Sequence, residues 1–326
     1  MSLATSVFSG DGFNSFMLGS GWAWFSLVSA IFSAGFYLVN QYWRMPGELL
    51  VFTMRIMIVV LMTPFVHTLS WPQNPLFYAA VLVTVMVGTS SDVRTFNASA
   101  KFGAGMVSRL MPVTVLVAFF LWFVLRPSLL FEYLARPWLT LGILVSLSAC
   151  VYFAMRLNRC EVSRSAMVYM APALAGYTIT TVLNKYAMDF GAAAADFSGV
   201  VLGYMYVQSL IALVLVGPYV LWARRSKPAP LLQTVPTVPA APAVRLKPLL
   251  AASFAAALVW LAHMVFKNYA MAYSESPSYQ AAINLTAPVM IAGVYRIVGH
   301  REETDVRAGM GIVAAALLLV VVTAFK

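Results

Sequence analysis

Apolar runs alternate with short polar breaks along nearly the whole chain. Most of the runs approach the roughly 20 residues that cross a hydrocarbon core as an α-helix. Helices and closed barrels are the structures that span lipid, because every backbone polar group must be satisfied internally. The pattern therefore predicts an all-α integral membrane protein with ten spans at these approximate limits: 22–41, 48–66, 76–99, 103–125, 137–156, 165–187, 197–222, 248–272, 277–298 and 306–325.

The composition supports the membrane class. Hydrophobic residues make up 61% of the chain and charged residues 10%, whereas a soluble domain has about 25% charged residues. The net charge is +10, but many basic residues flank apolar runs, where they set the orientation in the membrane. We therefore expect a lipid bilayer, and not nucleic acid, as the partner of this basic chain. The two cysteines, Cys150 and Cys160, are too few for a disulfide framework.

Two segments lie outside the predicted spans. Residues 1–21 form an expected N-terminal tail, whose one charge is Asp11 and which lacks the basic start of a cleavable signal peptide. Residues 224–247, RRSKPAPLLQTVPTVPAAPAVRLK, are rich in proline and basic at both ends. We expect this second segment to be a solvated, partly extended linker between the seventh and eighth spans.

The polar stretch GTSSDVRTF, residues 88–96, follows an apolar run that is too short to cross a membrane. The run from Leu76 to Val87 has twelve residues, or about 18 Å of helix, against a hydrocarbon core of about 30 Å. A spanning helix must therefore continue through the polar stretch, which places Asp92 and Arg94 inside the membrane. The alternative is a short re-entrant segment with these residues in a loop.

A second embedded polar stretch is VWLAHMVFKNYAMAY, residues 259–273. His263 and Lys267 are four residues apart and share one helix face with Trp260. Ionisable side chains inside a membrane are costly and usually face a cavity or a partner. The alternatives are a lysine that reaches the interface from the helix end and a buried, hydrogen-bonded histidine.

Each of these stretches leads into a matching passage. FNASAKFGAGMVSRLMPV ends at Pro112, and NYAMAYSESPSYQAAINLTAPV ends at Pro288. The passages share a polar helix, a tight connection and a helix that contains a proline. Two further segments also pair, SAGFYLVNQYW at residues 33–43 and LAGYTITTVLNKY at residues 174–186.

With these segments the chain resembles the EamA-type ten-helix transporters of the drug/metabolite transporter superfamily. The resemblance extends from about residue 22 to residue 325. The chain departs from the family pattern in its long linker and in the turn Gly299-His300-Arg301-Glu302, where a glycine-glutamate turn is usual.

The resemblance implies two inverted five-helix repeats, residues 22–156 and 157–326, around a central cavity with a substrate site near the midplane. It also implies that the first, third and fourth spans of each repeat line this cavity. The candidate substrate-binding residues in those spans are Tyr37, Asn40, Ser91, Asp92, Arg94, Arg109, Tyr177, Thr181, Asn184, Trp260, His263, Lys267, Gln280 and Asn284.

The charges among these candidates favour an anionic substrate. Asp92 and Arg94 lie about 200° apart around a helix, so both cannot point at one ligand. We expect an Asp92–Arg109 ion pair, which leaves Arg94 to face the cavity. Together with Lys267 and Arg55, these basic groups exceed the single deep acid, and arginine binds carboxylate or phosphate bidentately. If Arg109 points away, Asp92 could instead bind a cationic drug.

We therefore expect a secondary transporter for a small polar, anionic metabolite, a multi-pass protein of a bacterial inner membrane. A flippase for a lipid-linked sugar or phosphate headgroup is the alternative, followed by a membrane-embedded enzyme and a non-transporting assembly partner. The chain has no HExxH, GxSxG or ATP-binding motif, so we expect neither an enzyme nor a cofactor. His263 could couple transport to protons, because imidazole changes charge near neutral pH.

Orientation and oligomeric state stay open. The odd-numbered connections have twelve Lys and Arg residues and the even-numbered connections and termini have four, which places both termini outside the cell. The family resemblance implies cytoplasmic termini. Gly309 and Gly311 in the last span could form a close helix contact, which leaves a homodimer open.

Overall fold

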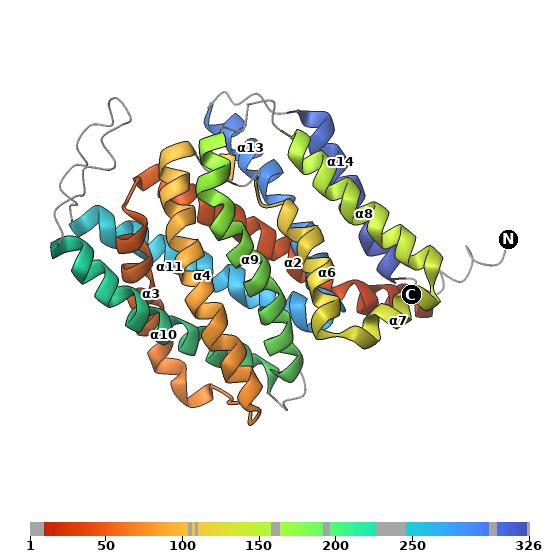
Figure 1. The fold of residues 1–326 in the computed structure, drawn as a ribbon, viewed down its shortest axis with the longest axis horizontal. Helices are drawn as coiled ribbons and strands as arrows, with labels where there is room; N and C mark the ends of the chain where they lie inside the picture. The colour runs from red at the N-terminus through yellow and green to blue at the C-terminus, as the bar shows by residue number, and fades with distance from the viewer. Residues whose placement is uncertain are drawn as a thin grey trace.

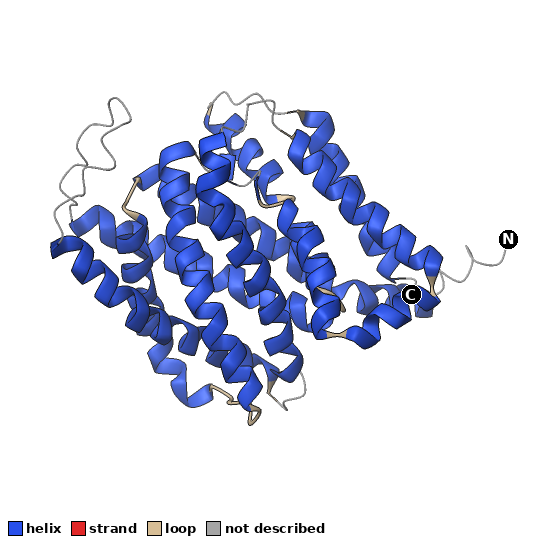
Figure 2. Ribbon diagram, in the orientation of Figure 1, coloured by secondary structure: helices blue, strands red, loops and turns tan. Residues whose placement is uncertain are grey.

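The computed structural model describes residues 10–103, 106–107, 110–157, 164–191, 196–225, 246–299 and 305–324. These residues form helices joined by short loops, without a strand among them (Figures 1 and 2). The helices are α2 (Gly10–Trp43), α3 (Gly47–Met62), the 3₁₀-helix η1 (Thr63–Thr68), α4 (Pro75–Phe102), α6 (Val113–Leu125), α7 (Pro127–Ala135), α8 (Pro137–Arg156), α9 (Arg164–Gly191), α10 (Phe197–Arg225), α11 (Leu246–Tyr273), α12 (Pro277–Asn284), α13 (Ala287–Val298) and α14 (Val306–Ala324).

The predicted all-α membrane architecture is confirmed. Within the described part of the chain, nine helices are long and apolar enough to cross a membrane. Helices α6 and α7 make a tenth span if they are counted together, although they meet at an angle of 109°. The protein is therefore a multi-pass membrane protein, and the predicted count of ten depends on this bent pair.

Helix α4 answers the question raised by the polar stretch at residues 88–96. It is one continuous helix of 28 residues, or about 42 Å at 1.5 Å per residue, so the re-entrant alternative is wrong. The side chain of Asn74 accepts a hydrogen bond from the backbone N–H of Leu76 and caps its start. The helix ends at Gly103, whose φ of 88° lies in the region that glycine tolerates best.

Other boundaries differ from the predicted ones because prolines start and stop helices. Helix α2 begins at Gly10, within the expected tail, and its apolar span begins at Ser20. Helix α7 was not predicted, although Pro127 stands in its first turn, where the missing N–H costs nothing. The fourth span, predicted from residue 103, contains a turn before α6 begins at Val113. Most of the expected linker lies outside the described residues.

The ninth predicted span is broken in two. Helix α12 ends at Asn284 and α13 begins at Ala287, with a turn between them. Pro288 has no N–H to donate to the carbonyl four residues earlier, and its ring clashes with that carbonyl, so the helix restarts at this point. Pro112 precedes α6 in the same way.

Small residues set how closely the helices pack. Helices α4 and α9 form an extensive interface, in which a Cβ at Gly176 would lie 2.1 Å from Oγ of Ser91. Helices α8 and α14 lie side by side at one edge of the molecule (Figure 1). There, a Cβ at Gly311 would lie 2.5 Å from the ring of Phe153. The close contact expected of Gly311 is thus formed within the chain, and the homodimer stays a prediction.

We expect Gly176→Ala to destabilise the protein by about 1–3 kcal/mol, because the added methyl overlaps the Ser91 hydroxyl. Thermal unfolding of the purified protein in detergent measures this loss. Adding Ser91→Ala should restore part of it, since the Ser91 Cβ lies at 3.5 Å, while the contact with Cγ1 of Val87 at 3.0 Å remains. Gly293→Ala is the matched control, because nothing lies within 4 Å of its added Cβ. Equal melting temperatures for the two single variants would contradict this account of the α4–α9 contact.

Candidate functional site

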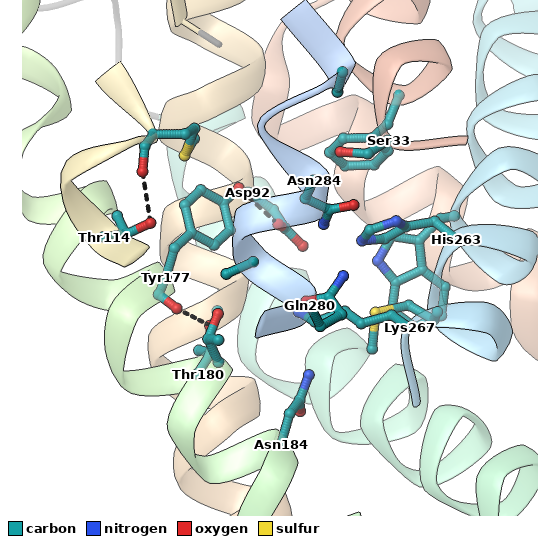
Figure 3. Close-up of a pocket in the computed structure, with 18 of the residues that line it drawn as sticks. Ser33, Asp92, Thr114, Tyr177, Thr180, Asn184, His263, Lys267, Gln280 and Asn284 are labelled. Atoms are coloured by element: carbon teal, nitrogen blue, oxygen red, sulfur yellow. Dashed lines mark hydrogen bonds between the residues drawn. The ribbon is translucent and has the colours of Figure 1, made fainter. Parts of the chain in front are cut away.

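A pocket of about 140 Å³ lies among helices that are distant in the sequence. Helices α2, α4, α9, α10 and α11 contribute to its lining, together with both sides of the α12–α13 break (Figure 3). Ten of the fourteen candidate residues line it: Tyr37, Asp92, Tyr177, Thr181, Asn184, Trp260, His263, Lys267, Gln280 and Asn284. The three- and four-residue spacings of these candidates thus correspond to helix faces that meet at one place.

Asp92 is the buried acid at the pocket wall. Its Oδ2 accepts a hydrogen bond from Nη2 of Arg55 at 3.0 Å, which is also an ion pair. Its Oδ1 accepts a hydrogen bond from the Tyr177 hydroxyl at 3.0 Å. The Arg55 guanidinium lies 4.1 Å from the centre of the Trp260 ring, a cation–π contact. Arg55 does not line the pocket, and its side chain is 1% exposed. The charge of Asp92 is therefore neutralised by a residue buried in the protein.

The expected partner of Asp92 was Arg109, which lies outside the described residues. The expectation that Arg94 faces the pocket is wrong, because its side chain is exposed. The physical reason is the helical rotation of about 200° between positions 92 and 94. With Asp92 turned inward to Arg55, Arg94 must turn outward.

Asn40 and Ser91 also lie away from the pocket and have structural roles. The Asn40 side chain is fully buried and bridges two chain segments. Its Nδ2 donates to the carbonyl oxygens of Met45 at 2.9 Å and Phe96 at 3.0 Å, and its Oδ1 accepts from the Met45 N–H at 2.7 Å. These bonds fasten the α2–α3 connection to α4, next to Arg44 with its φ of 50°. Ser91 packs on α9, and its hydroxyl donates to the helix backbone.

Among the described lining residues, Lys267 is the cation without a salt bridge, although Asp92, which is paired with Arg55, is near enough to attract its charge. It lines the pocket, and its ammonium makes no hydrogen bond or ion pair with any residue that the structure describes. In Figure 3 it extends toward Gln280 from α11. Because a charge that is shielded from water attracts counter-charge strongly, this ammonium favours an anion in the pocket.

His263 both lines the pocket and is held by α2, so the two interpretations of this residue are compatible. Its Nδ1 lies 3.0 Å from the backbone oxygen of Ser29 and 3.0 Å from the Ser29 hydroxyl. A carbonyl oxygen only accepts, so Nδ1 is the protonated nitrogen, and Nε2 of the neutral ring is an acceptor. Ser29 was not predicted, because serine is common at helix contacts in membranes.

Four polar atoms of the lining residues are buried without a hydrogen-bond partner among the described residues. They are Oγ1 of Thr84, Oε1 of Gln208, Nε2 of Gln280 and Oδ1 of Asn284. Buried polar atoms in folded proteins nearly always have a partner, so a small side-chain rotation that pairs these groups with a bound molecule would be favourable. Asn184 differs, because its Oδ1 accepts a hydrogen bond from the Tyr204 hydroxyl.

Sequence reasoning missed several lining residues. Gln208 belongs to the seventh span, which the family resemblance places outside the cavity, and its one signal was an isolated amide in a long apolar run. The small hydroxyl residues gave no signal, since they are frequent in membrane helices. The hydroxyl residues added by the structure are Ser33, Thr84, Thr114 and Thr180. In the described part of the chain, no cluster of three or more His, Cys, Asp or Glu could hold a metal ion.

We expect Arg55→Met to cost about 3–5 kcal/mol of stability, because it leaves the Asp92 carboxylate buried without its cation. Adding Asp92→Asn should recover part of the loss by removing the unpaired charge. The same substitution at the exposed Arg94 is the control, with an expected change within about 0.5 kcal/mol. Melting temperatures in detergent distinguish these results. A stable Arg55→Met protein would show that the ion pair is dispensable.

No protein-family model matches the chain, and no curated protein matches it. What the pocket binds is therefore inferred from its own residues.

Proposed function

We propose that the protein is a secondary transporter that moves a small polar, anionic organic solute across the membrane by alternating access. The observation that supports this proposal best is the unpaired Lys267 ammonium in a pocket between membrane-spanning helices. Embedded charges are costly and are usually retained where they face a substrate pathway. A purely structural bundle has less use for an embedded charge without a salt bridge.

The charge balance of the pocket favours an anion over a cation. Asp92 is already bound by Arg55 and Tyr177, so it is not free to attract a cationic drug. Lys267 then leaves one positive charge facing the pocket. A carboxylate or phosphate would neutralise this charge at short range in surroundings of low dielectric constant.

The breaks at the two prolines fit a transporter of inverted repeats. Met111 and Thr114 beside the start of α6, and Leu285 and Pro288 at the start of α13, all line the pocket. Helix N-termini are partially positive, and in inverted-repeat transporters the ends of broken helices bind substrate at the midplane. We assign α6 to the first repeat, residues 22–156, and α13 to the second.

Alternating access also needs contacts between the repeats that can break and re-form. Asp189 of α9 accepts hydrogen bonds from Arg126 at 2.7 Å and from Lys185 at 2.5 Å. Arg126 follows the last residue of α6, so this ion-pair trio joins the two proposed repeats, and its Lys185 is the sequence neighbour of the pocket residue Asn184. We assign to the trio a contact that breaks when the repeats move apart.

A flippase for a lipid-linked headgroup is the second candidate, and one observation favours it. An apolar groove of about 440 Å³ borders the α12–α13 break at Ile283 and Thr286, next to pocket residues Asn284 and Leu285. A lipid tail could lie in this groove while its headgroup enters the pocket. The groove is lined by Ser20, Ala23, Trp24, Leu27, Ile283, Thr286, Val289, Met290, Val313, Ala316, Leu317 and Val320.

We expect small carboxylates or phosphates to raise the melting temperature of the wild-type protein, because a ligand that binds only the folded state stabilises it. At a ligand concentration of 100 times the Kd, the free energy of unfolding rises by about 2.7 kcal/mol. Lys267→Met should abolish the rise, and Lys267→Arg should retain part of it by keeping the charge. Lys101→Met, an exposed site, is the control. A rise with organic cations alone would overturn the anion proposal.

Transport assays in liposomes separate the two candidates. We expect liposomes that contain the wild-type protein to take up a soluble anion. We expect labelled lipid to be scrambled in them at the same rate as in protein-free liposomes. Leu317→Trp, which fills the groove from its exposed side, should then leave uptake unchanged. Leu318→Trp is the matched control, because Leu318 is the next residue along the helix and its side chain is exposed but does not line the groove. Lipid scrambling that falls several-fold in Leu317→Trp alone would establish the flippase instead.

A further inference from the structure

Among the residues that the structure describes, the pocket offers one net positive charge to a ligand. The carboxyl and amino groups in this part of the lining are Asp92 and Lys267, and Nδ1 of His263 is occupied by the Ser29 carbonyl oxygen. Arg55 cancels the charge of Asp92, so of the described lining residues Lys267 is left to compensate a ligand. A second negative charge would be buried without a counter-ion, which is strongly unfavourable.

Amide side chains form the uncharged polar part of the pocket. Among the described residues, Oε1 of Gln208, Oδ1 of Asn284 and Nε2 of Gln280 are buried without a hydrogen-bond partner. Gln280 is 1% exposed and Gln208 is 6% exposed. A ligand that can pair with these amides removes unsatisfied buried groups, whereas an apolar ligand leaves them unsatisfied and binds more weakly.

Gln208, Gln280 and Asn284 line the same pocket as Lys267. Gln280 and Asn284 are one helical turn apart on α12, on the face directed at His263 and Lys267 (Figure 3). Gln208 reaches the pocket from α10. A single small ligand can therefore contact the ammonium with one end and the amides with the rest of its length.

Hydroxyl groups satisfy these amides best. A hydroxyl both donates and accepts, so it pairs with amide oxygens and with an amide N–H, whichever way each amide is turned. A ligand ammonium would also donate, but it would stand in the same small pocket as the Lys267 ammonium and be repelled. Trp260 and Phe36 add apolar surface for the carbon chain between the polar groups.

We propose that the substrate is a hydroxylated organic monoanion, with its carboxylate or similar group on Lys267 and its hydroxyl groups on Asn284, Gln208 and Gln280. This proposal rests on the proposed transport of anions and makes it more specific. Lys267 supplies the affinity for charge, and the three amides supply the selection for hydroxyl groups.

The test compares three carboxylates of equal chain length: threonate with hydroxyl groups, butyrate without them, and tartrate with hydroxyl groups and a second carboxylate. Dissociation constants are measured by calorimetry on the detergent-purified full chain. We expect threonate to bind about tenfold or more tightly than butyrate, because butyrate leaves buried amide atoms unpaired. Tartrate should bind more weakly than threonate.

Asn284→Leu replaces an amide with an apolar side chain of similar size. It should reduce the preference for threonate over butyrate, while the binding of butyrate still depends on Lys267. Gln280→Leu is the second variant, used if the first does not fold. Thr114→Val is the control inside the pocket, because its hydroxyl already donates to the Met111 oxygen at 2.6 Å. It should leave the preference unchanged.

The outcomes distinguish the two levels of the proposal. Equal binding of threonate and butyrate, both lost in Lys267→Met, would overturn the hydroxyl selection and leave anion transport standing. Tighter binding of tartrate than of threonate would overturn the restriction to one charge. Binding of all three that is indifferent to Lys267→Met, or no binding at all, would overturn the anion site itself.

Discussion

The buried Asp92 carboxylate is the constraint on which the rest of the molecule depends. A carboxylate inside a membrane protein needs a counter-charge and hydrogen bonds, because lipid and protein interiors solvate it poorly. Arg55 of α3 and Tyr177 of α9 supply them, and Trp260 of α11 covers the guanidinium. One acid on α4 therefore fixes three other helices around the pocket.

Because Asp92 is satisfied by Arg55 and Tyr177, the proposed preference for anions rests on Lys267. The proposed preference for hydroxyl groups rests on the amides of α10 and α12, three of whose atoms have no partner among the described residues. The proposal thus assigns affinity and selection to different residues, which is why substitutions can separate them.

The two proline breaks give the pocket its irregular walls. At Pro112 and Pro288 the backbone leaves and re-enters helical geometry, so turn and helix-start residues reach the lining beside side chains from continuous helices. Irregular backbone at membrane depth is tolerated where protein or a water-filled cavity covers it. On the far side of the α12–α13 break lies the apolar groove, so one short turn separates a polar from an apolar environment.

The lengths of the apolar runs by themselves determined the all-α membrane class and most span limits, because the number of residues needed to cross the lipid is a local constraint. Spacings of three and four residues also placed Trp260, His263 and Lys267 on one helix face. Only the tertiary structure decided that Asp92 pairs with Arg55, that Arg94 turns outward, that Asn40 fastens a loop and that Gln208 reaches the pocket. Such partners lie on separate helices, and their distances depend on how the helices pack, which a pattern along one helix does not contain.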